Sequence, residues 1–203
     1  NELRAGLTYE SSTWYNINDE LSQRLIAVSS NTNGSLDSDV VDPRYTNVYA
    51  PYKLQTPSRL TGSLAYVFGK SGLISVDYAV KDYGNTKFKP NNDPYFRGLN
   101  TQMSNTLKNS GELRIGAEYK IERLSLRGGY RYEQSPYQNN TTIGDLTGYS
   151  GGLGYNFGST KLDLSYAYAK RDTQQAFFSQ GFTDGAKINA INNTVSLTLL
   201  FEL

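Results

Sequence analysis

The side chains able to carry out chemistry here are carboxylates, cations and hydroxyls, because the 203 residues include no histidine and no cysteine. That composition excludes disulfides, Cys/His zinc sites and nucleophiles activated by an imidazole. An unassisted carboxylate or a Ser-Lys arrangement is the enzyme chemistry that is left. We therefore predict that the chain is not an enzyme and that it uses no cofactor.

Three aspartates in one oxygen-rich segment, Asp37, Asp39 and Asp42, are the best candidates for a metal site. Alternating aspartates can hold calcium, but this spacing lacks the full EF-hand pattern. A solvated acidic loop is the favoured interpretation, so no metal site is predicted.

Charge is balanced across the chain, with 20 Lys and Arg against 19 Asp and Glu. No global field favours nucleic acid, so none is predicted as a partner. Charged residues nevertheless recur on one side of extended segments. They are Arg4, Asp77, Arg114, Glu118, Arg127, Arg131, Glu133 and Asp163. Two interpretations stay open, contact with a ligand carboxylate or ion-pair ladders in a solvated lumen, and the second is favoured.

These charges alternate with apolar residues in segments of about ten residues, as in outer-membrane barrel strands. In 161–170, Leu162 and Tyr166 point one way while Asp163 and Ser165 point the other. None of the apolar faces carries a charge, and a Lys or Arg facing lipid at the midplane costs roughly 2–4 kcal/mol. Strands are predicted near 2–13, 57–69, 72–83, 111–121, 124–134, 147–158, 161–171 and 191–203.

The fold class predicted from this pattern is all-β, an antiparallel transmembrane β-barrel with eight strands in this chain. The 17 tyrosines suit a boundary between lipid and water. A soluble β-sandwich or lipocalin-like barrel is the alternative, because alternation is expected there too. That alternative leaves the lengths of the connections unexplained.

The connections between the predicted strands are of two kinds. Three are short, around 69–72, 122–123 and 159–160, and four are long, 15–56, 84–110, 134–147 and 172–190. Outer-membrane barrels have short periplasmic turns and long extracellular loops. With the C-terminus in the periplasm, every short turn is periplasmic and every long loop extracellular.

The short turns also predict strand registers. A two-residue turn at Glu122–Arg123 places Glu118 opposite Arg127, and Arg114 opposite Arg131. The second pair is unfavourable unless the diagonal carboxylates offset it. Those carboxylates belong to Glu112 and Glu133. A turn at Ser159–Thr160 places Tyr168 opposite Gly151 and Asn156 opposite Asp163.

Two stretches of the long loops have apolar residues at helical spacing, 17–28 and 95–108. A helix is predicted in each, with Asn18 or Asp19 able to cap the first. The candidate ligand-binding side chains on them are Ile17, Leu21, Leu25, Phe96, Leu99, Met103 and Leu107. The alternative, slightly favoured, is that both helices bury their apolar stripes against the rim of the barrel.

Several stretches carry a resemblance to a known family. They are TYESSTWY (8–15), AYVFGKSGLISVDY (65–78), GAEY (116–119), SLRGGYRYEQSPY (125–137), IGDLTGYS (143–150), GLGYNFG (152–158), FFSQGFTD (177–184) and the LTLLFEL end. The chain resembles the FadL/TodX family of outer-membrane hydrophobe transporters, in the form found in Bacteroidota. The block 125–158 is the most specific part.

The resemblance implies a 14-stranded barrel with an N-terminal hatch inside the lumen. Because this chain supplies eight strands and lacks a counterpart of the hatch, we expect it to be the C-terminal portion of a larger protein. A self-closed eight-stranded barrel is the alternative. The terminal strand also resembles the signal that barrel-insertion machinery reads.

The resemblance further implies location in the outer membrane of a Gram-negative bacterium and passive uptake of hydrophobic molecules such as long-chain fatty acids. It would make the loop helices an apolar capture groove. A different role, a structural or docking subunit of an outer-membrane secretion or assembly complex, stays open. Expected partners are outer-membrane lipid and lipopolysaccharide, a hydrophobic ligand, barrel-assembly machinery during insertion and proteins of such a complex.

Overall fold

The chain is known from a computed structural model, which describes residues 1–30, 32–176 and 185–201. Most of these residues form strands, so the predicted all-β class is confirmed. No helix in the described ranges is both long and apolar enough to cross a membrane. The segment FFSQGFTD and the last two residues of the predicted terminal strand lie outside the described residues.

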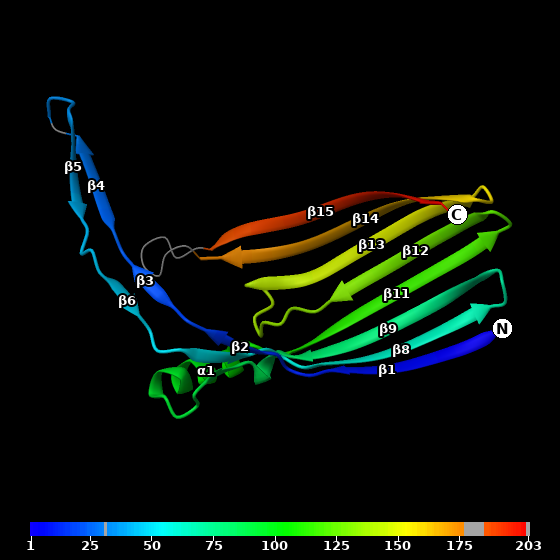
Figure 1. Ribbon diagram of the computed structural model, residues 1–203, viewed down its shortest axis with the longest axis horizontal. Coiled ribbons are helices and arrows are strands. Elements are labelled where there is room, and N and C mark those ends of the chain that lie inside the picture. The colour runs from blue at the N-terminus through cyan, green and yellow to red at the C-terminus, as the bar shows by residue number, and fades with distance from the viewer. Residues whose placement is uncertain (31, 177–184, 202–203) are drawn as a thin grey trace.

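Eight antiparallel strands of the described part form one sheet, in the order β1-β8-β9-β11-β12-β13-β14-β15 (Figure 1). The sheet is open, with β1 and β15 at its two edges. A closed barrel is therefore not seen in these residues. The strands are β1 (Glu2–Glu10), β8 (Arg59–Phe68), β9 (Gly72–Asp82), β11 (Asn109–Ile121), β12 (Leu124–Glu133), β13 (Ile143–Asn156), β14 (Thr160–Gln175) and β15 (Ala186–Phe201).

Alternation along these strands gives the sheet two different faces. One face exposes large apolar side chains, such as Leu7 (77% exposed) and Val195 (70%). Among the described residues, Ala79 is the one buried hydrophobic side chain, whereas Glu112 is buried with 2% exposure. A soluble sandwich would bury the apolar face and expose the charges. This sheet leaves its apolar face exposed, which is the distribution expected of strands in contact with lipid.

Short and long connections lie at opposite ends of the sheet, as Figure 1 shows. The N-terminus and the three short turns lie at one end, and the long connections leave from the other. In the turn from β8 to β9, Gly69 adopts φ 57° and the N–H of Ser71 donates to the Phe68 carbonyl over 3.0 Å.

The register predicted for β11 and β12 is confirmed, whereas the one for β13 and β14 is wrong by two residues. Glu118 lies opposite Arg127, as predicted. Gly151 lies opposite Tyr166, and Asn156 opposite Lys161. The turn is centred on 158–159, because the Phe157 N–H donates to the Thr160 carbonyl over 2.8 Å.

The backbone conformation of Gly158 explains this shift in register. Gly158 has φ 108°, a conformation that residues with a Cβ rarely adopt. Its N–H donates to the Asn156 side-chain carbonyl over 2.8 Å, which holds the tight turn one residue earlier than predicted.

The long connection 15–56 is an extended arm of strands and not a loop with a helix. Its strands are β2 (Trp14–Ile17), β3 (Glu20–Ser22), β4 (Leu25–Ser30), β5 (Leu36–Val41), β6 (Thr46–Val48) and β7 (Tyr52–Gln55). The helix predicted over 17–28 is therefore wrong. Ile26 and Val28 are β-branched, and the Asn33-Gly34 dipeptide, with Gly34 at φ 78°, supplies a hairpin turn that pairs β4 with β5.

The second long connection contains η1 (Tyr83–Asn85), β10 (Lys87–Lys89) and α1 (Pro94–Thr106). The helix predicted over 95–108 is confirmed by α1. It begins after Asp93, whose carboxylate accepts the Tyr95 N–H over 2.8 Å, and Pro94 occupies the first turn. Strands β10, β7 and β2 form a small sheet, and α1 lies beside it (Figure 1).

Candidate functional site

A cavity of about 780 Å³ lies where the base of the arm meets α1. The arm supplies part of its wall, and β10 with the start of α1 supplies the rest. Its lining residues are Asp19, Tyr49, Ala50, Pro51, Tyr52, Phe88, Pro90, Asp93, Tyr95, Phe96 and Leu99. The site is thus assembled at the long-loop end, from three segments that are far apart in the sequence.

Strand pairing directs aromatic side chains into this cavity. In the sheet β10-β7-β2, Phe88 pairs with Leu54, and Tyr52 pairs with Ile17. Residues paired across an antiparallel sheet lie on the same face, and the next residue along lies on the other. Phe88 and Tyr52 line the cavity, so this is the inward face of the small sheet.

The aromatic rings form one cluster. The Tyr52 ring centroid lies 5.3 Å from that of Phe96 and 5.8 Å from that of Phe88. Phe88 and Phe96 are stacked, with centroids 5.7 Å apart, and Tyr95 lies 5.7 Å from Phe96. Rings at these separations bury apolar area in favourable geometries. The cluster gives the cavity a rigid apolar wall suited to a hydrophobic molecule.

Two carboxylates stand at this wall. Asp19 accepts a hydrogen bond of 2.5 Å from the Tyr52 hydroxyl, and its backbone carbonyl accepts the Tyr49 N–H over 3.0 Å. Asp93 caps α1. The hydrogen bond to Asp19, helped by partial burial, raises the pKa of Tyr52 above its ordinary value of 10. The Tyr52 phenol is therefore a fixed donor at neutral pH.

The structure brings only some of the predicted ligand-binding residues together. Phe96 and Leu99 line the cavity. Ile17 pairs with Tyr52 without lining it, and Leu21 and Leu25 lie farther out on the arm, on β3 and β4. Met103 is near the end of α1, and Leu107 directly follows it. The missed lining residues include Tyr52 and Phe88, and the aromatic density of 83–96 was the available signal for Phe88.

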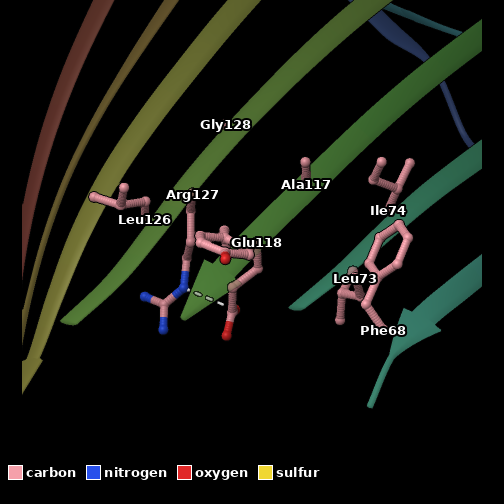
Figure 2. Close-up of a pocket in the computed structure, with 9 residues that line it drawn as sticks. Phe68, Leu73, Ile74, Ala117, Glu118, Leu126, Arg127 and Gly128 are labelled. Atoms are coloured by element: carbon pink, nitrogen blue, oxygen red, sulfur yellow. Dashed lines mark hydrogen bonds and ion pairs between the residues drawn. The ribbon is translucent and has the colours of Figure 1, made fainter. Parts of the chain in front are cut away.

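A second feature is the charged face of the large sheet, where cross-strand ion pairs form a ladder. Figure 2 shows Arg127 and Glu118 turned toward each other on adjacent strands, while Ala117 and Ile74 project the other way. Arg127 Nε lies 3.0 Å from Glu118 Oε2, and a second nitrogen of Arg127 pairs with Asp163. These predicted charges are brought together as an ion-pair ladder.

The buried carboxylate of Glu112 is the centre of a cluster nearer the loops. It lies 3.3 Å from Arg59, 3.8 Å from Lys81 and 3.5 Å from Arg131, and also pairs with Arg114. The predicted diagonal compensation of Arg114 and Arg131 is therefore present.

The neighbouring Glu133 carboxylate lies 2.9 Å from Arg131 and 3.3 Å from Arg171. Outside these clusters, Arg4 pairs with Glu2 on its own strand, and Asp77 lies opposite Arg114 in register. The sequence did not reveal Arg59, Lys81 and Arg171 as members, because they reach these carboxylates from strands that no short turn joins to β11 or β12.

The three candidate calcium aspartates lie on the arm. Asp37 and Asp39 are on β5, and an Asp42 oxygen accepts the Arg44 N–H over 3.0 Å. In the described part of the chain, no group of three or more acidic, histidine or cysteine residues is arranged to hold a metal ion.

Comparison with known proteins identifies the family to which this chain belongs. The family described as "Outer membrane protein transport protein (OMPP1/FadL/TodX)" matches residues 1–198. The chain belongs to this family. FadL/TodX proteins are transport channels and not enzymes, in agreement with the prediction made from the sequence. A search of curated proteins finds no match.

Solved structures resemble the fold of this FadL/TodX chain. The crystal structure of a Pseudomonas aeruginosa FadL homologue matches with a TM-score of 0.60 at 15% identity, over 98% of this chain and 49% of that one. The CymD monoaromatic hydrocarbon channel matches with a TM-score of 0.46 at 18% identity, over 83% of this chain and 43% of that one. The chain thus spans about half the length of the structures it matches.

Proposed function

We propose that this protein mediates passive uptake of hydrophobic small molecules across the outer membrane of a Gram-negative bacterium. The observation that carries the proposal is the aromatic cavity at the long-loop end of the sheet. Family membership supports transport, and the uncharged outer face of the strands suits lipid. In this proposal, flow is passive and runs down the concentration gradient.

Closure of the sheet into a barrel is part of the proposal. In hydrocarbon, the unpaired N–H and C=O groups of edge strands such as β1 and β15 cost several kcal/mol each. Both edges must therefore be paired, with each other or with further strands, and the family resemblance implies 14 strands in all. In that barrel the charged face is the lumen, and lipid and lipopolysaccharide contact the apolar face. Barrel-assembly machinery inserts it.

The proposed path begins at the cavity, where the long loops capture a ligand outside the cell. The ligand then passes through the lumen and is released laterally or into the periplasm. Long-chain fatty acids are the candidate substrates that the resemblance implied. Their apolar tails suit the rings of Tyr52, Phe88 and Phe96. Their carboxylates, however, would lie near the carboxylates of Asp19 and Asp93 in the same lining, which is unfavourable.

Uptake by whole cells tests the proposal. Cells lacking the full gene should lose uptake of radiolabelled oleate, radiolabelled naphthalene or both. Wild-type protein should restore it, Phe96→Ala should not, and Met103→Ala should serve as a matched control because Met103 does not line the cavity. Unchanged uptake of both probes in the deletion strain would refute transport as the function.

A docking role is the second candidate, and the outer end of the arm favours it. On the hairpin of β4 and β5, one face carries the uncharged pairs Ile26–Val40 and Ser30–Leu36. Leu36 is 76% exposed. An isolated two-stranded hairpin is at best marginally stable in water, so a covering partner would stabilise it. If deletion of 24–43 abolishes secretion or complex assembly while hydrophobe uptake stays unchanged, the docking role is favoured.

A further inference from the structure

The cavity is distinguished by the sign of its charges. Its lining contains Asp19 and Asp93, and no lysine or arginine. Neither aspartate takes part in an ion pair among the described residues; Asp19 accepts from the Tyr52 hydroxyl and Asp93 from the Tyr95 N–H. An aromatic cavity with two carboxylates and no cation is therefore a poor environment for a second anion.

The nearby lysines are directed away by the strand alternation. Lys53 and Lys89 are paired with each other across β7 and β10, on the face opposite Phe88 and Leu54. The Lys89 ammonium confirms this orientation, because it lies 3.9 Å from the centroid of the Trp14 ring, outside the cavity lining. Lys87 directly precedes Phe88 on β10, so it lies on the same outward face as Lys89. These three lysines of the paired strands thus leave the cavity lining without a positive charge.

The start of α1 offers no compensation either. Free N–H groups at a helix N-terminus attract anionic groups. Here the Asp93 carboxylate already accepts the Tyr95 N–H over 2.8 Å, and Pro94 has no N–H to donate. The end of the helix that faces the cavity is therefore occupied by a negative charge of the protein itself.

We propose that this cavity selects hydrophobes that carry no negative charge, and that it disfavours carboxylates such as fatty acid anions. This inference rests on the proposed function and names its substrate class. The rings supply apolar contact to any hydrophobe, and the π faces tolerate a cation. Asp19 and Asp93 repel an anion, so charge decides among ligands of equal apolar area.

Binding of three matched probes to the purified full-length protein tests the selection. Naphthalene, 2-naphthoate and 2-naphthylmethylammonium share one ring system and differ in charge. Specific binding of each is taken as the part lost in Phe96→Ala in the same detergent. We expect naphthoate to bind at least tenfold more weakly than naphthalene, and the ammonium probe to bind at least as well as naphthalene.

The double variant Asp19→Asn/Asp93→Asn is the matched control, because asparagine keeps an acceptor for the Tyr52 hydroxyl and for the helix cap. It should raise the ratio of naphthoate binding to naphthalene binding at least fivefold over that of the wild type. Equal binding of naphthoate and naphthalene to the wild type, or rejection of both charged probes alike, would overturn the selection. Specific binding of none of the probes would instead overturn the proposed function, and the selection with it.

Discussion

Arg59 Nη2 lies 3.3 Å from Glu112 Oε2, and this pair joins β8 to β11 across the intervening strand β9. The Glu112 side chain is 2% exposed, while that of Arg59 is 24% exposed. Lys81 on β9 reaches the same carboxylate from between them. With Arg131 on β12 also 3.5 Å from this carboxylate, one buried anion connects four neighbouring strands on the charged face near the loops.

Replacing Glu112 by Gln should destabilise the protein. Breaking a buried ion pair costs about 3–5 kcal/mol, because the remaining charges lose compensation. The surrounding cations keep part of their water, so we expect the free energy of unfolding to fall by about 2–3 kcal/mol, at or below the lower end of that range. Urea unfolding of the lipid-reconstituted full-length protein measures this.

Glu2→Gln is the control for this change. Its partner Arg4 lies on the same strand, and both side chains are more than half exposed. Exposed pairs contribute about 0–1 kcal/mol, so this variant should unfold almost as the wild type does. Equal effects of the two substitutions would show that the Glu112 cluster does not stabilise the sheet.

The register of β13 and β14 predicts a specific cross-link, and these 203 residues contain no cysteine that would compete. Gly151 lies opposite Tyr166, whereas Tyr168 lies opposite Tyr149, two residues farther along the pair of strands. Gly151→Cys/Tyr166→Cys should therefore form a disulfide under mild oxidation. Gly151→Cys/Tyr168→Cys should form far less, and a reversed yield on non-reducing gels would restore the register first predicted from sequence.

Local signals predicted much of the sheet, because period-two alternation is written into each strand separately. The turn at 122–123 also fixed its register locally, whereas the turn at 158–159 depended on the backbone freedom of Gly158. The arm was missed because β4 is stabilised by pairing with β5, and helical spacing can be read into the same apolar residues. Alternation can be recognised within one segment, whereas pairing depends on two segments and cannot be predicted from either one alone.

The candidate site was only partly predictable for a similar reason. Phe96 and Leu99 stood out because they lie on a periodic helix. Asp19 and Tyr52 come from the two sides of the arm and meet only after β2 pairs with β7. No pattern within either segment indicates that contact.

Replacement by alanine should change the free energy of unfolding at one glycine of the sheet and not at another. A Cβ on Gly72 would stand 2.2 Å from the Glu118 backbone carbonyl oxygen, so the turn side of β9 must shift. A Cβ on Gly128 would meet nothing within 4 Å. Gly72→Ala should lower the free energy of unfolding by about 1–3 kcal/mol, as overpacking does, and Gly128→Ala should leave it nearly unchanged. Similar unfolding midpoints for both variants would contradict this assignment.

The Tyr52–Asp19 hydrogen bond predicts a pH dependence at the alkaline end. Because the pKa of Tyr52 is raised above 10 in the folded protein, the fold favours the protonated phenol. The contribution of this contact is fully present below pH 10 and is lost as pH rises through the higher folded pKa. Tyrosinate absorbance of the wild type minus that of Tyr52→Phe should therefore titrate above pH 10. Asp19→Asn removes the charged acceptor, so it should shift that difference titration back toward 10, and an unshifted curve would show that Asp19 does not hold the phenol proton.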